Sequence, residues 1–107
     1  TVVAEKYQAM VSLGMVNTRL KDYFDLWVLM KHVSFDPNIL REAIAATFAR
    51  RKTPMPQELP LGLSGAFTLD ATKITQWKAF LSKNKLQAPP LDELVSELRP
   101  LLWGNNA

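Results

Sequence analysis

The 107-residue chain contains no cysteine, one histidine and four glycines. Without cysteine it can form neither a disulfide nor a thiolate metal site, and a single histidine cannot build a histidine metal cluster. The glycines never form the cluster that a glycine-rich phosphate-binding loop needs. No apolar run approaches the length of a membrane span, so we expect no membrane segment and a cytoplasmic location.

The composition is that of one folded domain. Hydrophobic residues make up 48% of the chain and charged residues 21%, which is ordinary for a globular protein, and the length fits a single core spanning residues 1–107. The net charge of +3 is unevenly placed, because residues 1–52 hold eight Lys and Arg against five Asp and Glu, whereas residues 53–107 hold five against five. A basic first half is typical of either a solvated surface or a phosphate-bearing partner.

Apolar residues recur at intervals of three and four, and no segment alternates as a strand would. We therefore predict an all-α fold, a compact bundle of about five helices. Asp36 and Asp70 are expected N-caps, and Pro100 is expected to kink the last helix or to end its hydrogen bonding early. The predicted helices cover about residues 3–14, 17–32, 36–52, 70–83 and 91–102.

Residues 53–65 should form a Pro-rich loop, because three prolines and two glycines fall within this stretch. A short helical turn is expected around Ser64 to Phe67. The core should consist of large apolar residues on the inner helix faces, namely Tyr7, Met10, Phe24, Trp27, Ile44, Phe48, Trp77, Phe80, Leu94 and Leu98.

Charged residues gather in the second predicted helix. Arg19, Asp22 and Asp25 lie on one stripe of this helix, with its aromatic residues and Leu20 on the other side. Arg19 and Asp22 are spaced i,i+3, and Lys21 and Asp25 are spaced i,i+4, as in ordinary exposed helix ion pairs.

The spacing leaves two interpretations open. The cluster is either a solvated ion network or part of a site for metal and phosphate. In the second case Asp22 helps to hold a divalent metal, and Lys6, Arg19 or Lys21 neutralises phosphate charge. One acid cannot complete the oxygen shell of magnesium, and the sequence offers no second acidic pair.

These residues carry a resemblance to a known family. Glu5-Lys6 followed by Arg19-x-Lys21-Asp22-x-x-Asp25-Leu26 resembles the C-terminal part of the AbiEii-type nucleotidyltransferase toxins of bacterial toxin–antitoxin and phage-defence systems. The resemblance covers nearly the whole chain. It continues through Ala46-Thr47-Phe48-x-Arg50-Arg51-x-Thr53-Pro54, Gln76-Trp77-x-Ala79-Phe80-Leu81 and Ala88-Pro89-Pro90-Leu91.

The resemblance implies that Lys6 contacts phosphate and that Asp22 is the aspartate of the family's Lys-Asp motif, with Arg19, Lys21 and Asp25 completing the charge network. It also implies a magnesium cofactor, a nucleoside triphosphate substrate, an acceptor such as tRNA and an antitoxin partner. The family's Gly-Ser motif and paired aspartates are absent from this sequence. We expect them in a domain that precedes Thr1, which makes this chain a C-terminal fragment that is inactive alone.

Two other functions compete with this interpretation. A non-enzymatic helical module could bind an antitoxin, another protein or RNA through the basic first half. A DNA-reading helix over residues 36–51 is a weaker choice, because most of its positive charge lies at its C-terminal end.

The core assignment gives a first prediction. Replacing Phe48 with alanine should lower the free energy of unfolding by about 3–5 kcal/mol through the cavity that it leaves. Urea denaturation of both proteins measures this change. A loss below about 1 kcal/mol would show that Phe48 lies outside the core.

Overall fold

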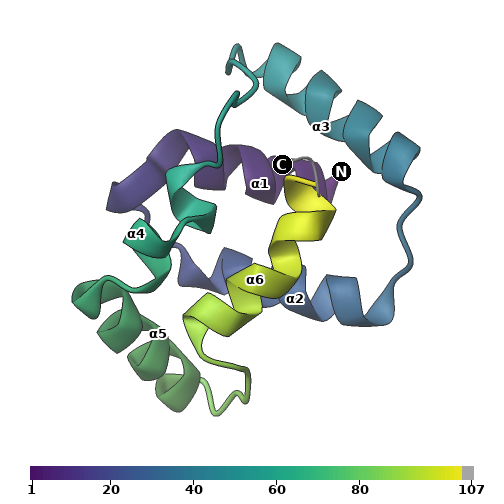
Figure 1. Cartoon of the computed structure of the whole chain (residues 1–107). Helices are drawn as coiled ribbons and strands as arrows, with labels where there is room; N and C mark the ends of the chain where they lie inside the picture. Colours follow the sequence, from purple (N-terminus) through teal and green to yellow (C-terminus); the bar gives the residue numbers. More distant parts are fainter. Residues whose placement is uncertain (105–107) are drawn as a thin grey trace.

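The chain folds into helices joined by short loops, as the computed structural model of residues 1–104 shows (Figure 1). The described residues contain no strand, so the all-α prediction is confirmed. Five long helices are accompanied by a single-turn α-helix and two 3-10 turns. The elements are α1 (Val2–Leu13), η1 (Gly14–Val16), α2 (Leu20–His32), α3 (Pro37–Arg50), η2 (Leu61–Leu63), α4 (Gly65–Thr68), α5 (Ala71–Lys83) and α6 (Leu91–Leu102).

Side-chain caps fix where three of the helices begin. Asp36 accepts hydrogen bonds from the backbone of Asn38 and Ile39, with Pro37 in the first helical turn. Asp70 accepts from the backbone N–H of Lys73 in the same way, so both predicted N-caps are confirmed. Thr1 caps α1, and Gly14 ends it with a φ of 51°, in the left-handed region that suits glycine.

One predicted helix boundary is wrong. α2 begins at Leu20, not at Asn17 or Thr18, and the Asn17 side chain accepts a hydrogen bond from the Arg19 N–H at 2.7 Å just before it. α6 spans Leu91–Leu102 as predicted, and its hydrogen bonding does not end early at Pro100. The proline removes a single N–H donor, and the Trp103 N–H still donates to the Arg99 carbonyl at 2.8 Å.

The Pro-rich loop is shorter than predicted. Residues 53–60 hold no helix or strand, but η2 follows at once, and α4 provides the helical turn expected around Ser64 to Phe67. Both short elements bury large side chains, since Leu63 and Phe67 are fully buried. The loop itself lies at the surface, and η2 and α4 return the chain to the core.

The long helices pack in two pairs, with α3 against α1 and α6 across α2, while α5 lies beside the start of α2 (Figure 1). Most of the predicted core is buried. Phe24, Trp27 and Phe80 are corrections, because they are only partly buried and pack against the edge of the core. α2 instead turns Leu20, Tyr23 and Leu26 inward.

Tyr23 is the centre of contacts that sequence periodicity did not reveal. Its ring stacks on Phe67 with 5.3 Å between the centroids, and its hydroxyl donates to the Gly62 carbonyl at 2.8 Å. Burial raises the pKa of Tyr23, opposed by a hydrogen bond with Asn17, so the hydroxyl stays neutral. α2, α4 and η2 are thus joined around one buried ring.

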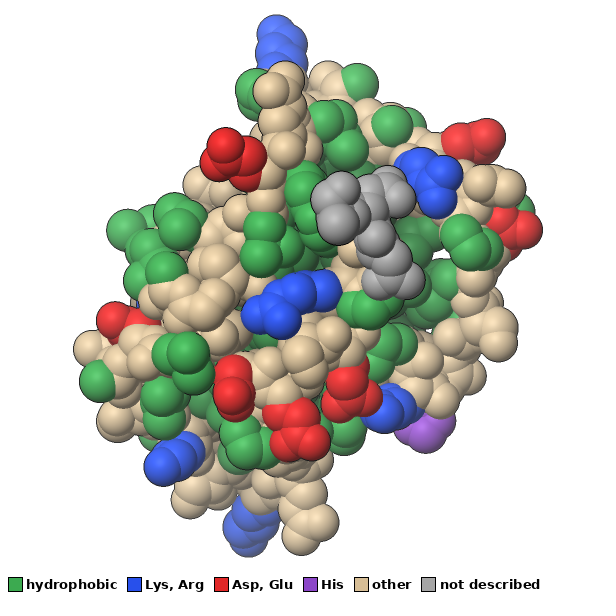
Figure 2. Space-filling view, in the orientation of Figure 1, with side chains coloured by type: hydrophobic (Ala, Val, Ile, Leu, Met, Phe, Trp, Pro, Cys, Tyr) green, Lys and Arg blue, Asp and Glu red, His purple; other side chains and the backbone are tan. Residues whose placement is uncertain are grey.

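The surface is not uniform in charge. Figure 2 shows acidic side chains gathered over the N-terminal part of α6, a helix that carries Asp92, Glu93 and Glu97. None of the helices described is long and apolar enough to cross a bilayer.

The close approach at Gly62 gives a prediction. A Cβ atom there would lie 2.7 Å from the Tyr23 hydroxyl oxygen and 2.8 Å from Met10 Cγ, and both side chains are buried. Gly62→Ala should therefore lower the free energy of unfolding by about 1–3 kcal/mol in urea denaturation.

Gly65→Ala is the matched control. Its added Cβ would make only an ordinary contact, 3.7 Å from Leu69 Cδ1, and should leave stability unchanged or slightly raised. Equal effects of the two substitutions would show that packing at Gly62 is not the constraint.

Candidate functional site

Five charged side chains from α1 and α2 meet at one place, which we name the charge cluster: Lys6, Arg19, Lys21, Asp22 and Asp25. Lys6 crosses from α1 to α2, where its Nζ donates to Asp22 Oδ1 at 2.8 Å and lies 3.2 Å from Asp25 Oδ2. The structure thus brings together all five residues that the sequence singled out.

Asp22 uses both of its oxygens, whereas Asp25 meets both of its lysines through Oδ2. Arg19 Nε lies 3.0 Å from Asp22 Oδ2, and Lys21 Nζ donates to Asp25 Oδ2 at 2.6 Å. Three cations surround two carboxylates, so the cluster carries one excess positive charge. Both predicted helix pairs, i,i+3 and i,i+4, are present.

Burial divides the cluster into an inner and an outer part. The side chains of Asp22 and Lys6 are 8% and 21% exposed, whereas those of Arg19 and Lys21 are 56% and 72% exposed. The picture of a solvated ion network therefore describes Arg19 and Lys21 but not Asp22. A carboxylate this far from water remains ionised only when cations and hydrogen bonds compensate for its lost hydration.

Neighbouring charges favour the ionised states of Lys6 and Asp25. The hydrogen bond to Asp22 raises the pKa of Lys6, against partial burial, which lowers it. Partial burial acts to raise the pKa of Asp25, but the hydrogen bonds from Lys21 and Lys6 outweigh it and the pKa lies below its usual value. At neutral pH, Lys6 and Asp25 are therefore both charged.

The cations retain donors for a further anion. A lysine ammonium has three N–H bonds and a guanidinium five. Lys6 directs two of its three toward carboxylates, Lys21 directs one, and Arg19 uses its Nε. The unpaired N–H groups of Arg19 and Lys21 lie at the exposed edge of the cluster, where a phosphate can reach them.

An open groove of about 440 Å³ adjoins this edge between the start of α2 and α5. We name it the α2–α5 groove. Its charged lining residues are Arg19, Lys21 and Lys83, all cations, and the Phe80 side chain supplies apolar surface. A groove lined by one sign of charge attracts the opposite charge, so this one favours phosphate.

Two buried polar residues fix the start of α2 beneath the cluster. Lys73 is 5% exposed, and its Nζ donates to the Asn17 carbonyl at 2.6 Å and lies 4.9 Å from the centroid of the Phe67 ring. Asn17, 1% exposed, holds the Arg19 N–H. Sequence reasoning gave Asn17 only as a possible start of the helix and gave Lys73 no role. The available signal for Lys73 was its place one helical turn before Trp77, on the buried face of α5.

The residues present do not fit a magnesium site by themselves. Across residues 1–104 no group of three or more His, Cys, Asp or Glu side chains is placed to hold a metal ion. Both oxygens of Asp22 already face cations, Lys6 on one side and Arg19 on the other.

The charge cluster predicts how stability depends on acid. Because the pKa of Asp25 is lower in the folded state, its contribution is present above the unfolded value of about 3.9 and is lost as the pH falls through the folded value. Asp25→Asn should therefore flatten the loss of stability between about pH 5 and pH 2. Urea midpoints measured across this range test the effect.

Glu42→Gln is the control, because this exposed glutamate forms none of the ion pairs found in residues 1–104. Its acid profile should follow the unmodified protein. An unchanged profile for Asp25→Asn would contradict the assignment. The contribution of Lys6 to stability has the opposite pH dependence. Because the pKa of Lys6 is raised in the folded state, this contribution is present below about pH 10.4 and is lost as the pH rises through the folded pKa.

Comparison with known proteins identifies the family. A family model described as "Nucleotidyl transferase AbiEii toxin, Type IV TA system" matches residues 1–97. No curated protein and no solved structure matches the chain significantly. The family match covers all five residues of the charge cluster and α1 through α5. The chain therefore belongs to the AbiEii nucleotidyltransferase toxin family of type IV toxin–antitoxin systems.

Proposed function

We propose that this chain is the helical domain of a nucleotidyltransferase and supplies Lys6 and Asp22 to an active site shared with a second domain. The reaction is transfer of a nucleotidyl group from a nucleoside triphosphate to an acceptor such as tRNA. Family membership gives the reaction class. The observation that supports the local assignment is the inner ion pair of Lys6 and Asp22, linked to exposed cations at the edge of a basic groove.

Lys6 is the phosphate-contacting residue in this proposal. Two carboxylates hold its ammonium group, and one N–H bond is left for a phosphate oxygen. Negative charge develops on the pyrophosphate leaving group during nucleotidyl transfer. A fixed cation stabilises that charge without having to reorganise, and this is the largest contribution that a protein side chain makes to such a reaction.

Asp22 positions the cations that meet the substrate. Its two oxygens hold Lys6 from α1 and Arg19 from the start of α2, so one carboxylate sets the distance between two phosphate-binding groups. Arg19 and Lys21 bind further phosphate oxygens, and Lys83 extends the basic surface across the groove. The roles of Asp22 as a metal ligand and of magnesium as the cofactor stay predictions from the family resemblance.

The second domain provides what this chain lacks. The sequence has neither a glycine-rich nucleotide loop nor a pair of acids to share a metal, so these groups come from outside it. The basic groove faces that domain and the substrate, and the acidic surface over α6 is left to other contacts. We further propose a cytoplasmic location and a cognate antitoxin, in keeping with the toxin–antitoxin family.

The competing module, which binds a protein or RNA without catalysis, would use exposed basic residues such as Arg50, Arg51 and Lys52 at the end of α3. Binding a partner through these exposed residues would not require the buried carboxylate of Asp22. Burying Asp22 with Lys6 costs desolvation free energy, and a catalytic role explains why the chain keeps this ion pair.

Asp22→Asn tests the proposal in the protein that joins this chain to the second domain. Transfer of labelled nucleotide to RNA should fall by about 100-fold or more, because Lys6 and Arg19 lose the charge that positions them. The thermal midpoint and helical circular dichroism report whether the fold is retained. Arg19→Gln, at an exposed position, should instead raise the KM for the triphosphate with little loss of stability.

Glu97→Gln is the matched control, because it removes a carboxylate that accepts from Lys31 at 2.7 Å in a separate ion pair. Its transfer activity should be unchanged. Full activity of a folded Asp22→Asn protein would remove Asp22 and its partners from the active site and leave the non-catalytic module as the better account.

A further inference from the structure

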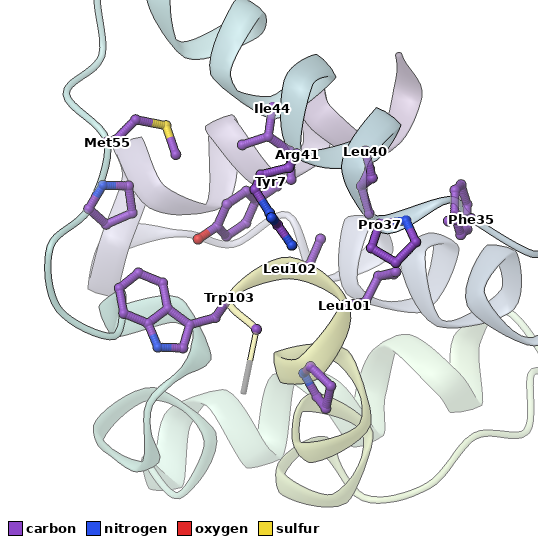
Figure 3. A pocket seen from close by; sticks show the side chains of 13 residues that line it. Tyr7, Phe35, Pro37, Leu40, Arg41, Ile44, Met55, Leu101, Leu102 and Trp103 are labelled. Atoms are coloured by element: carbon purple, nitrogen blue, oxygen red, sulfur yellow. The ribbon is translucent and has the colours of Figure 1, made fainter. Parts of the chain in front are cut away.

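A second cavity lies between α1, α3 and the C-terminal end of α6 (Figure 3). Its volume is about 320 Å³, and it shares no lining residue with the charge cluster or the α2–α5 groove. This volume is at the lower end of the range for small-molecule pockets, enough for a single-ring compound with a short substituent.

Most of the residues that line the cavity have apolar side chains. Leu40, Ile44 and Leu102 are buried beneath the cavity, and Met55 and Trp103 close one side of it (Figure 3). Aliphatic side chains together with an indole ring favour a flat apolar body over a hydrated one.

The Tyr7 hydroxyl is a polar group on the wall of this cavity. Tyr7 is 1% exposed, and in Figure 3 its hydroxyl points into the cavity. Within residues 1–104 it forms no hydrogen bond to another residue. The hydroxyl therefore has no competing partner among these residues and can donate to a ligand in the cavity. Burial raises the pKa of Tyr7 to about 12, so the hydroxyl remains a donor at neutral pH.

Arg41 brings a positive charge to the same cavity. Its guanidinium group also points inward in Figure 3, and no carboxylate of the described residues lies within 4.0 Å of it. Arg41 is the only charged residue among the described residues that line the cavity. One cation matches a singly charged carboxylate, whereas phosphate would require further cations or donors on these walls.

We propose that this cavity binds a small organic carboxylate with a flat apolar body. The carboxylate pairs with Arg41 and accepts a hydrogen bond from the Tyr7 hydroxyl, while the ring packs against Leu102, Met55 and Trp103. The site is separate from the proposed nucleotidyl-transfer site and does not depend on that assignment.

Phenylacetate is a suitable probe, and phenylacetamide is its uncharged counterpart of nearly equal shape. Titration of the ¹⁵N-labelled 107-residue chain should give saturable chemical-shift changes at Trp103 and Leu40, with a Kd on the order of 1 mM or below. Phenylacetamide should bind about tenfold more weakly, because it cannot form the ion pair with Arg41. Inorganic phosphate should cause no saturable change at these residues.

Two substitutions locate the binding. Arg41→Gln should weaken phenylacetate binding about tenfold, and Tyr7→Phe should weaken it a few-fold, about the effect of one hydrogen bond. Both retain most of the original side-chain volume, and the amide spectrum verifies that each protein is folded. Arg51→Gln removes an exposed cation near the other end of α3 and should change nothing.

The proposal is overturned if phenylacetate gives no saturable change at the cavity residues. It is equally overturned if phenylacetate and phenylacetamide bind alike, or if a folded Arg41→Gln protein binds as well as the unmodified chain. Phosphate saturating the same residues would also contradict it, because it would assign an inorganic anion to the cavity.

Discussion

The burial of the Asp22 carboxylate is the constraint on which the arrangement of α1 and α2 depends. A negative charge this poorly exposed needs nearby cations, and Lys6 from α1 and Arg19 from the start of α2 provide them. α1 must therefore cross α2 at a height that places Lys6 opposite Asp22. The same ion pairs leave further N–H groups of these cations available. The side chains that neutralise the buried carboxylate in the fold are therefore also the ones proposed to bind phosphate.

A layer of buried hydrogen bonds supports this arrangement from below. Lys73 holds the carbonyl of Asn17, Asn17 holds the N–H of Arg19, and the Tyr23 hydroxyl holds the carbonyl of Gly62. The bonds of Lys73 and Tyr23 join segments that are distant in the sequence, and the bond of Asn17 to Arg19 fixes the local turn before α2. Such directional contacts fix positions more narrowly than apolar packing does, and a phosphate-binding site requires that precision.

Much of the fold could be predicted from the sequence because its signals are local. The Asp36-Pro37 start and the Asp70 cap act within a few residues, and both helices begin there. The inner face of α2 could not be predicted in the same way. Tyr23 and Phe24 are neighbours of similar size, so apolar periodicity does not decide which one is buried, and the contact of Tyr23 with Phe67 decides it.

The candidate site shows the same division. The i,i+3 and i,i+4 pairs within α2 follow from spacing, whereas the contact of Lys6 with Asp22 joins residues sixteen positions apart and depends on the packing of two helices. Sequence reasoning named Lys6 as a candidate phosphate-binding residue, but spacing could not predict its contact with Asp22. Neither spacing nor resemblance revealed that Lys73, a lysine within an ordinary helix, anchors the beginning of α2.

The hydrogen bonds to two carbonyls of η2 affect how this turn can move. Gly62 is held by the Tyr23 hydroxyl from α2, and Leu63 is held by Arg99 Nε from α6 at 2.7 Å. η2 is therefore hydrogen-bonded to both α2 and α6, which are far apart in the sequence. A fluctuation that moves η2 out of the core must break both bonds, so α2 and α6 lose a contact with this turn in the same event.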